Sequence, residues 1–330
     1  MASSIIGIDI GANEIKLVVL EKGRMTEAVR ERLPRDLVQG GMITSFDALG
    51  EFIGMVCKEN KLSPKKCALL LPDALTYVRH ITMPMMKESH LRLNLPYEFH
   101  DFIQDDKDKY VFDFAVLETR TTEDGSEILE LMAAAAKKEV IANYTSALRT
   151  AGKKLVAVKP AVMALADLIP IPEEGEDEQE YCFINLGHSS TRVHIFRGRD
   201  LVATKIIEYG LRMLDQVIAE EKGVDIHIAS TYKESNFENV LEAESCQNLY
   251  QAIAIEIMRA INFYRFNHPE SRLADAYLCG GGAKIKPLAD IIAEQTELTL
   301  LSPALLLGDD VMLNDGDAAL FACALGTAME

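Results

Sequence analysis

The sequence is poor in the features that mark several common classes of protein. Its 34 lysine and arginine residues are outnumbered by 51 acidic ones, and no basic stripe interrupts the net charge of −17. Nucleic acids and anionic lipid headgroups attract basic surfaces, so we expect neither as a direct partner. No stretch approaches the roughly 18 uncharged apolar residues of a membrane-spanning helix, so we also expect no direct membrane insertion.

Two further absences concern the cellular compartment. None of the six cysteines forms a C-x-x-C pair, and most stand in apolar surroundings, as Cys182 and Cys323 do. This spacing predicts buried, reduced thiols rather than a metal site or a disulfide framework. The chain passes from Met1–Ser4 directly into a strand-like run, without the basic segment of a signal peptide. These features predict a cytoplasmic protein that would need a protein partner to hold it at a membrane.

The chain is long enough for two lobes, and one segment separates them. It has 330 residues, of which 48% are hydrophobic, and this is sufficient for two cores. Residues 173–180 are almost entirely acidic or polar and predict a solvated linker. We expect a first lobe over residues 1–172 and a second lobe over residues 181–330, with the C-terminal helix returning to the first lobe.

Residues 83–155 predict a small module inserted into the first lobe. Pro84 marks its start, and two strand-like runs follow with Asp124-Gly125 between them as a hairpin signal. A helix then ends at Gly152, a residue typical of helix C-terminal caps. The module should therefore contain a helix, a hairpin and a second helix.

The strongest signal is an internal duplication. Residues 8–20 read IDIGANEIKLVVL, and residues 184–196, at a constant offset of 176, read INLGHSSTRVHIF. Asp9 aligns with Asn185 in this pairing. Each copy predicts a hairpin with a glycine at its turn, so we expect a duplicated sheet core with a cleft between its halves.

The two glycine turns are suited to binding phosphate. A tight turn without side-chain bulk exposes successive backbone N–H groups, which together form a concave site for anions. An acidic residue just before the turn can hold, through water, the divalent cation that accompanies a nucleotide. One such turn is common in hairpins of any function, but two in register favour a shared nucleotide site.

A third glycine segment ends a predicted strand in the second lobe. Tyr277–Cys279 lead into three consecutive glycines, and a helix is expected to begin near Pro287. Three glycines would let the base or ribose of a nucleotide approach the backbone, whereas a plain strand-to-helix turn needs fewer. A Rossmann site is not favoured, because no G-x-G-x-x-G follows the first strand.

Together these residues resemble the FtsA/PilM branch of actin-like proteins, and the PilM type IV pilus assembly family in particular. The resemblance covers nearly the whole chain and rests on the two phosphate motifs at residues 9–16 and 185–191, the adenosine motif at 279–284 and the helix before it at 256–264. It implies an α/β, actin-like (ribonuclease H-like) two-lobed fold with a duplicated sheet core and an inserted small α+β subdomain.

The resemblance also implies a site for ATP and Mg²⁺. Asp9 would hold Mg²⁺ through water, and Lys16 would neutralise phosphate charge. Lys233 stands where relatives carry an acid and a lysine near the ribose, although the acid is Ser230 here. The other nucleotide-binding candidates lie on the two turns and the third glycine segment: Gly11, Ala12, Asn13, Gly187, His188, Ser189, Gly280, Gly281, Gly282 and Lys284.

Asn185 departs from the family pattern, which usually has aspartate at this position. In catalytic relatives that aspartate helps to orient metal and water for attack on the γ-phosphate. Asparagine is neutral and cannot accept a proton. We therefore expect ATP to be bound but hydrolysed slowly or not at all, and we assign no catalytic residue.

The resemblance implies an adapter as the function, in a type IV pilus or a related secretion or competence system. The adapter would dock the N-terminal tail of a PilN-like inner-membrane protein against the inserted subdomain. Pilus motor ATPases and other copies of the chain are further candidate partners. Two alternatives share the fold, namely a small-molecule kinase or ATPase and an FtsA-like filament-forming protein, and the fold alone does not choose among them.

Overall fold

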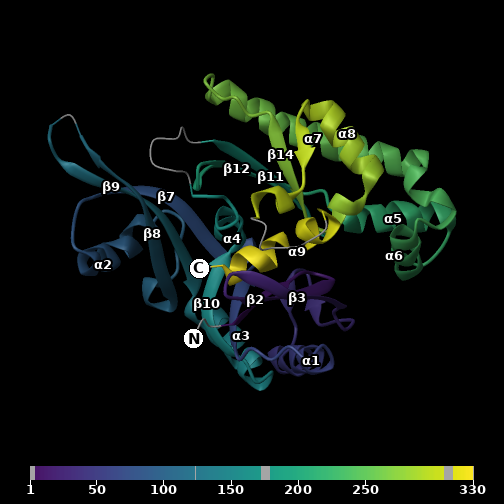
Figure 1. Cartoon of the computed structure of the whole chain (residues 1–330), viewed down its shortest axis with the longest axis horizontal. Coiled ribbons are helices and arrows are strands. Elements are labelled where there is room, and N and C mark those ends of the chain that lie inside the picture. Colours follow the sequence, from purple (N-terminus) through teal and green to yellow (C-terminus); the bar gives the residue numbers. More distant parts are fainter. Residues whose placement is uncertain (1–3, 123, 172–178, 308–314, 330) are drawn as a thin grey trace.

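The computed structural model describes residues 4–122, 124–171, 179–307 and 315–329. Two five-stranded sheets form the centres of two lobes, and a three-stranded sheet stands beside them (Figure 1). Most of the linker predicted at 173–180 lies outside the described residues. The described helices include none with the length and apolar character needed to cross a bilayer. All six cysteines are buried and free, as predicted.

The first lobe is built on a sheet whose outer face is covered by two helices. In spatial order the strands are β10 (Lys154–Pro160), β6 (Lys66–Leu71), β1 (Ile5–Ile10), β2 (Glu14–Glu21) and β3 (Arg24–Arg32). A short pair, β4 (Val38–Gln39) and β5 (Met42–Ile43), precedes the first helix. The helices α1 (Phe46–Glu59) and α3 (Lys138–Thr150) pack closely at Gly50, where a Cβ atom would lie 2.5 Å from the carbonyl oxygen of Ala147. Ser45 caps α1 by accepting a hydrogen bond from the N–H of Ala48.

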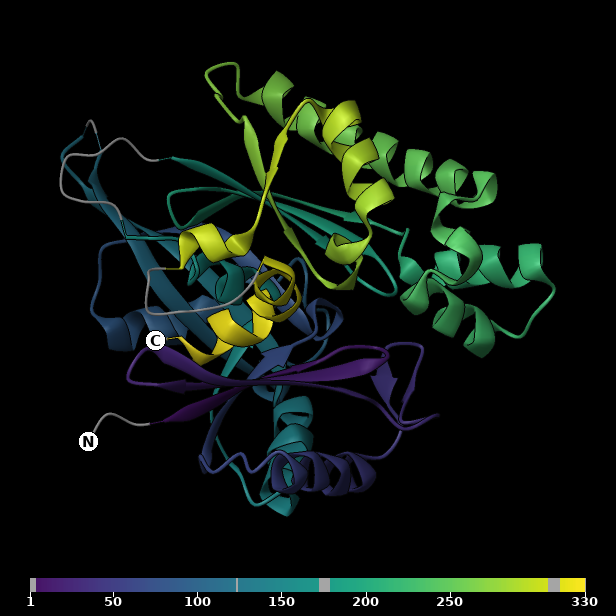
Figure 2. The same ribbon diagram turned by 45° about the vertical axis from the view of Figure 1, so that its right-hand side comes forward.

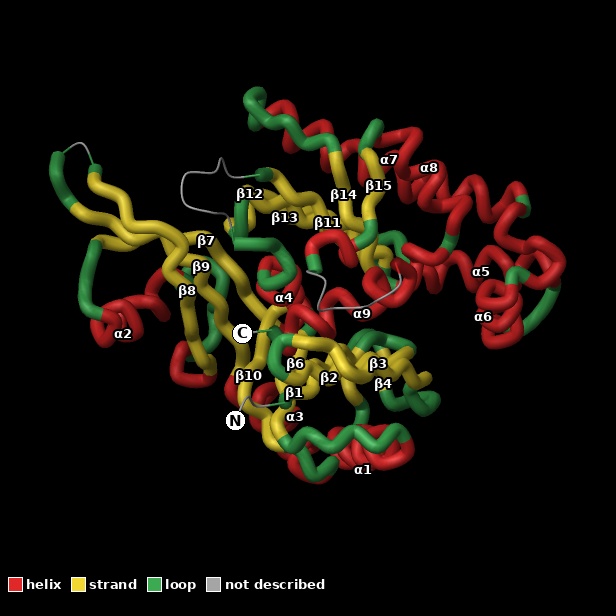
Figure 3. Tube along the Cα trace, in the orientation of Figure 1, coloured by secondary structure: helices red, strands yellow, loops and turns green. Residues whose placement is uncertain are grey.

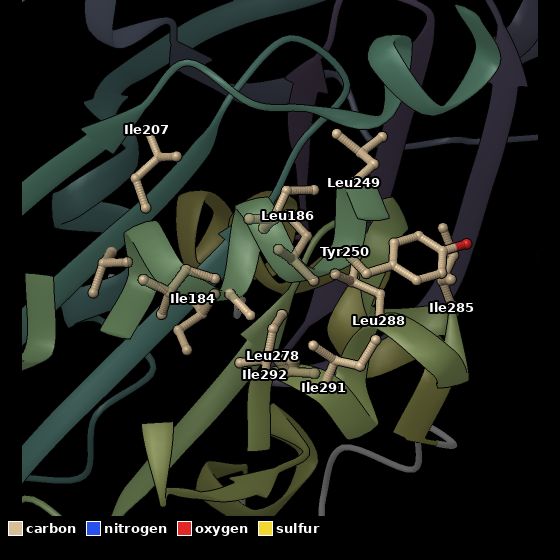
Figure 4. Close-up of a cluster of buried hydrophobic side chains, with 14 of the residues drawn as sticks. Ile184, Leu186, Ile207, Leu249, Tyr250, Leu278, Ile285, Leu288, Ile291 and Ile292 are labelled. Atoms are coloured by element: carbon tan, nitrogen blue, oxygen red, sulfur yellow. The ribbon is translucent and has the colours of Figure 1, made fainter. Parts of the chain in front are cut away.

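The second lobe repeats this plan. Its strands, in spatial order, are β13 (Asp200–Ile207), β12 (Thr191–Arg197), β11 (Glu180–Leu186), β14 (Asp275–Cys279) and β15 (Thr299–Leu301). Its helices are α5 (Leu211–Lys222), α6 (Ile226–Ser235), η3 (Phe237–Glu242), α7 (Glu244–Asn267) and α8 (Lys286–Thr296). Figure 4 shows Ile184 and Leu186 of β11 in the core with Tyr250 of α7 and Leu288 of α8. The lobe therefore has its own hydrophobic core.

The structure confirms the duplication. In each sheet the first three strands are antiparallel neighbours, and the last two join the first strand in parallel on its other side. The ladder between the second and third strands shifts register after Val19 in one lobe and after Ile195 in the other, again 176 residues apart. A bulge at the same point of both copies identifies the two sheets as versions of one unit.

The inserted subdomain is a three-stranded sheet with one helix, and its bounds differ from those expected. It contains β7 (Thr76–Pro84), β9 (Glu127–Lys137) and β8 (Tyr110–Thr121) in that spatial order, with α2 (Glu88–Glu98), η2 (Lys107–Lys109) and the preceding turn η1 (Asp73–Leu75). Figure 3 shows its long strands extending away from both lobes. The prediction of 83–155 began too late, because β7 starts at Thr76. It also ended too late, because α3 packs on α1 and β10 pairs with β6 in the first lobe.

Two helices lie between the lobes. The helices α4 (Ala161–Ala166) and α9 (Asp315–Ala328) pack against each other, and α9 also contacts β1 and β2 of the first lobe and β14 of the second. Figure 2 shows α9, in yellow, between the two sets of strands. At Gly7 a Cβ atom would lie 2.0 Å from the carbonyl oxygen of Ala324, so only glycine permits this approach. Two short turns, η4 (Gly281–Lys284) and η5 (Pro303–Leu306), complete the second lobe.

Candidate nucleotide site

The two glycine turns have the same hydrogen-bonded geometry. The N–H of Gly11 donates to the carbonyl of Glu14 over 2.8 Å, and the N–H of Gly187 donates to the carbonyl of Ser190 over 3.1 Å. The carboxylate of Glu14 acts electrostatically on the imidazole of His188, which belongs to the other lobe. The first turn, which contains residues 11–13, and the second turn, which contains residues 187–189, therefore belong to different lobes and are close enough for Glu14 to act on His188.

Asp9 and Lys16 are cross-strand neighbours in the first lobe. The Nζ atom of Lys16 lies 3.5 Å from Oδ2 of Asp9, and each side chain is 14% exposed. In the second copy the same register pairs Asn185 with Arg192, and the acid is missing. The Nε atom of Arg192 instead lies 2.6 Å from Oδ2 of Asp73, at the start of η1 in the first lobe. The loss of the second acid thus coincides with an ion pair between the lobes.

Asn185 is held in packing contacts. Its Nδ2 group donates to Sγ of Cys323 in α9 over 3.7 Å. Its Oδ1 atom lies against Gly280, where a Cβ atom would come within 2.5 Å. The residue that replaces the family aspartate therefore connects β11 to α9 and to the third glycine segment.

The three glycines of the third segment have different environments. Gly280 has φ +83°, and its N–H donates to the carbonyl of Ala319 in α9 over 2.9 Å. A Cβ atom at Gly282 would lie 2.6 Å from Cβ of Leu186, so this glycine is required for packing on β11. Gly281 differs, because a Cβ atom there would have Cδ1 of Leu211 as its nearest neighbour, at 3.5 Å. Gly281 is the member of the three that leaves room for a ligand.

A buried ion pair adjoins the second turn. The Nζ atom of Lys233 in α6 lies 2.7 Å from Oδ1 of Asp215 in α5, and the side chains are 11% and 4% exposed. Burial lowers the pKa of His188, and the charges of Lys233 and Arg212 lower it further, while Asp215 and Glu14 offset part of the effect. His188 is therefore mainly neutral near pH 7. Lys284, another predicted residue, instead pairs with Asp317 of α9 at 3.5 Å.

Sequence reasoning missed several charged residues of the site. Glu14, Arg30, Glu31 and Arg32 of the first lobe and Glu234 of the second line a hollow of about 320 Å³. Arg30 is hydrogen-bonded to Glu14, and Arg32 is hydrogen-bonded to Glu234 across the lobes. Burial alone would raise the pKa of Glu14, but Arg30, Lys16 and Arg32 outweigh it, so the pKa is lowered. The alternation of charges in β3 was the available signal for Arg30 and Arg32, whereas nothing in the sequence indicated Glu234 or Asp215.

A nucleotide with its cation fits these charges. Lys16, Arg30, Arg32 and Lys233 each have a carboxylate partner, and a triphosphate could replace those carboxylates as an acceptor of charged hydrogen bonds. Among the described residues no group of three histidine, cysteine or acidic side chains is placed to hold a metal. A cation would therefore rest on Asp9, phosphate oxygens and water, which is the coordination that Mg²⁺ usually adopts with nucleotides.

A second concave surface lies away from the turns, between the inserted subdomain and the second lobe. This groove of about 320 Å³ has apolar walls from β8, β9, α4, β12 and β13: Ala115, Val116, Leu117, Met132, Val162, Met163, Ala166, Phe196 and Leu201. Asp167, Arg199 and Asp200 add charge to its lining. Two of its walls, β8 and β13, are edge strands of their sheets. The groove is therefore lined mainly by apolar side chains and bordered by the edges of two sheets.

Comparisons with known proteins agree with this architecture. Residues 7–330 match the family described as type IV pilus assembly protein PilM. The structure is similar to that of a PilM–PilN type IV pilus biogenesis complex, with 22% identity, a TM-score of 0.82, and coverage of 99% of this chain and 98% of that one. No curated protein matches the sequence.

Two more distant structures share the fold. The ethanolamine utilization protein EutJ from Carboxydothermus hydrogenoformans is 13% identical, with a TM-score of 0.63 and coverage of 100% of this chain and 90% of that one. MreB5 of Spiroplasma citri bound to AMPPNP is 13% identical, with a TM-score of 0.54 and coverage of 99% and 95%. These likenesses confirm the predicted actin-like α/β fold. Because the family match spans nearly the whole sequence, the chain belongs to the PilM family of type IV pilus assembly proteins.

Proposed function

We propose that this protein binds Mg–ATP between its lobes and docks the N-terminal tail of a PilN-like inner-membrane protein, as an adapter in pilus assembly. The observation that carries the nucleotide part is the pair of matching glycine turns, one in each lobe, with Glu14 near enough to act on His188 of the second turn. Lys16 and Lys233 are ion-paired bases beside them. Each of these bases has a carboxylate partner, so a triphosphate would bind by replacing those carboxylates as the acceptor of charged hydrogen bonds. The nucleotide-bound MreB5 structure of the same fold supports this choice of ligand.

Each site residue would contact a different part of the bound Mg–ATP. The N–H groups of residues 11–13 and 187–189 would donate to the phosphates, and Asp9 would hold Mg²⁺ through water. Lys16 would give up its pairing with Asp9 in part and neutralise phosphate charge. Gly281 would let the adenosine approach the backbone, and Lys233 would lie near the ribose. Bound Mg²⁺ would supply charge neutralisation for the triphosphate.

Slow or absent hydrolysis is part of the proposal. Asn185 offers no carboxylate, and its amide is engaged with Cys323 and packed against Gly280. General-base assistance to an attacking water would need a group that accepts a proton, and the second turn provides none at this position. ATP would then act as a structural ligand that holds the two lobes together.

The test of the nucleotide site is a calorimetric titration of the full chain with ATP, with Mg²⁺ and with EDTA. We expect one ATP per chain, tighter binding in Mg²⁺, and turnover well below about 1 s⁻¹. Asp9→Asn should reduce the increase in ATP affinity that Mg²⁺ produces by about tenfold, the factor that corresponds to about 1.4 kcal/mol. The exposed Asp101→Asn is the matched control and should behave as wild type. A chain that binds no ATP, or that hydrolyses it rapidly, would contradict the proposal.

For the partner, we propose the groove between the inserted subdomain and the second lobe as the docking site. A membrane protein's short N-terminal tail is an extended segment, and the groove offers apolar walls with two edge strands to which such a segment can add. The related PilM–PilN complex supports the class of partner. The tail would keep this protein at the inner face of the membrane without a membrane helix of its own.

Val116→Asp should weaken binding of the tail by at least about tenfold. Val116 is 52% exposed on β8, so the fold should accept the change, whereas a carboxylate buried under an apolar tail pays a desolvation cost. Val111→Asp, on the same strand but outside the groove and 42% exposed, is the control. Fluorescence anisotropy of a labelled synthetic tail peptide gives both affinities. Equal losses in the two variants would place the docking site elsewhere.

A further inference from the structure

The helix α9 contacts the nucleotide site through its first half. The carbonyl of Ala319 accepts the hydrogen bond from Gly280, and Asp317 pairs with Lys284. Further along, Sγ of Cys323 accepts from Asn185. Charges of Asp9 and Lys16 also act on the Cys323 thiol, and α9 contacts β1, β2 and η4, so this part of α9 lies near the Asp9–Lys16 pair. A nucleotide held by these loops would therefore restrain the position of α9.

The second half of α9 is fixed to the wall of the groove. At Gly326 a Cβ atom would lie only 1.8 Å from the carbonyl oxygen of Ala164, so α9 and α4 touch backbone to backbone. The Nζ atom of Lys159 donates to Oδ2 of Asp167 over 2.6 Å and to the carbonyl of Gly326 over 3.3 Å, and it also donates to the carbonyl of Met329. Asp167 belongs to the groove, and three residues of α4 form its wall: Val162, Met163 and Ala166.

A second route joins α4 to the base of the cleft. The N–H of Ala161, at the start of α4, donates to the carboxylate of Asp73, which also pairs with Arg192 of the second lobe. Burial raises the pKa of Asp73, and Arg192 and Ala161 offset only part of that rise. The helix α4 is therefore linked at its start to Asp73 and, beyond its end, through Asp167 and Lys159 to α9. A movement of the lobes would change the environment of Asp73, because its partner Arg192 belongs to the second lobe.

We propose that nucleotide in the cleft and the tail in the groove bind with positive cooperativity, through α9 and α4. The inference rests on the proposed function, since it concerns regulation of those two sites. Close-packed helices shift as units rather than deform continuously. Bound nucleotide would restrain the position of α9, and α9 would in turn restrain α4. The tail would then bind to a groove whose α4 wall is already ordered. Each ligand thus reduces the ordering cost of the other, and the effect is reciprocal.

The test measures the affinity of a fluorescein-labelled peptide with the N-terminal sequence of the cognate PilN-like protein. The full chain is titrated without nucleotide and with Mg–AMPPNP. We expect AMPPNP to tighten peptide binding by about fivefold or more, the lower end of usual allosteric coupling. Lys159→Met should reduce this gain to less than about twofold, because Asp167 and the end of α9 are no longer joined, while nucleotide affinity alone changes little. Lys58→Met, at an exposed position on α1, is the matched control and should keep the full gain.

The outcomes separate this inference from the proposed function. If both ligands bind but the peptide affinity is the same with and without AMPPNP, or is weaker with it, the coupling is refuted and the two sites remain. If calorimetry detects neither ligand, the proposed function fails and the coupling fails with it. Should Lys159→Met not fold, Asp317→Asn breaks the contact at the other end of α9 and should also reduce the gain. A gain that survives in a folded variant would exclude α9 as the link.

Discussion

Gly281→Val is expected to weaken Mg–ATP binding by roughly a hundredfold while the protein stays folded. A Cβ atom at this position meets only Cδ1 of Leu211 at 3.5 Å, an ordinary contact, so the valine should find space in the free protein. That space is where adenosine would approach the backbone. Forcing an isopropyl group into a packed ligand contact costs about 1–3 kcal/mol, which corresponds to an affinity loss of about fivefold to 150-fold, and the close approach expected here favours the upper part of that range.

Calorimetry with Mg–ATP and Mg–ADP measures the loss, and thermal unfolding shows that the fold is retained. Gly281→Ala is the graded control and should lose less affinity, since its single methyl group makes only the Leu211 contact. Lys16→Ala, in the first lobe, tests the other half of the site, because it leaves Asp9 unpaired beside the phosphates. If both Gly281→Val and Lys16→Ala bind nucleotide as tightly as wild type, the site assignment is wrong.

Gly326→Ala should be strongly destabilising although it adds only one methyl group. The new Cβ atom would lie 1.8 Å from the carbonyl oxygen of Ala164 and 2.7 Å from its carbon, and both are backbone atoms that cannot rotate away. The helices α9 and α4 would have to separate, which exposes part of the core between the lobes. We expect a cost of roughly 3 kcal/mol, at the upper end for overpacked interiors.

Urea unfolding of the two variants Gly326→Ala and Gly54→Ala makes a matched comparison. Gly54 also lies inside a helix, α1, but its Cβ direction meets Ala151 at 3.4 Å, an ordinary distance. Alanine should therefore stabilise α1 there by up to about 1 kcal/mol, the difference in helix propensity. Opposite signs for the same substitution would support the close approach of α9 and α4. A neutral or stabilising Gly326→Ala would mean that these helices do not touch in solution.

The duplicated core could be predicted because its signal is local and repeated. Each hairpin carries its own glycine, and the register of Asp9 with Lys16 follows from the turn. Successive side chains of β2 point to opposite faces of the sheet, with Leu17 buried among the outer helices and Val18 in the cluster that contains α9. Each predicted turn therefore closes a hairpin, one in each lobe, as the repeated pattern indicated.

The charged contacts across the lobes could not be predicted, because they join residues far apart in the chain. Arg32 and Glu234 are 202 residues apart, and each stands in a charged stretch that reads as solvent-exposed surface. Asp73 follows Pro72 at the end of an apolar stretch, a position that gives no sign of a partner, and its pairing with Arg192 is set by how the lobes meet. Such pairs depend on the three-dimensional placement of two sheets, which periodicity does not encode.

The predicted bounds of the inserted subdomain were wrong for a different reason. The strand β7, TYVRHITMP, lacks regular alternation of apolar and polar residues, because its two ends pack against different partners. The composition of helix α3 does not distinguish a helix of the inserted subdomain from a helix of the first lobe. Only its packing on α1 assigns it to the first lobe. Segmentation by chain order therefore placed α3 with the wrong neighbours.

The position of α9 has a consequence for how the polypeptide is made. Val18, Leu20 and Leu70 of the first lobe are buried with Leu320, Ala324 and Leu325, from the last described helix to leave the ribosome. The nascent first lobe thus leaves one apolar sheet face without its covering helix until translation of the second lobe is almost finished. Its folding cannot be completed domain by domain, in the order of synthesis, as it is for chains whose units are sequentially independent. We expect chaperones to bind the nascent first lobe during that interval.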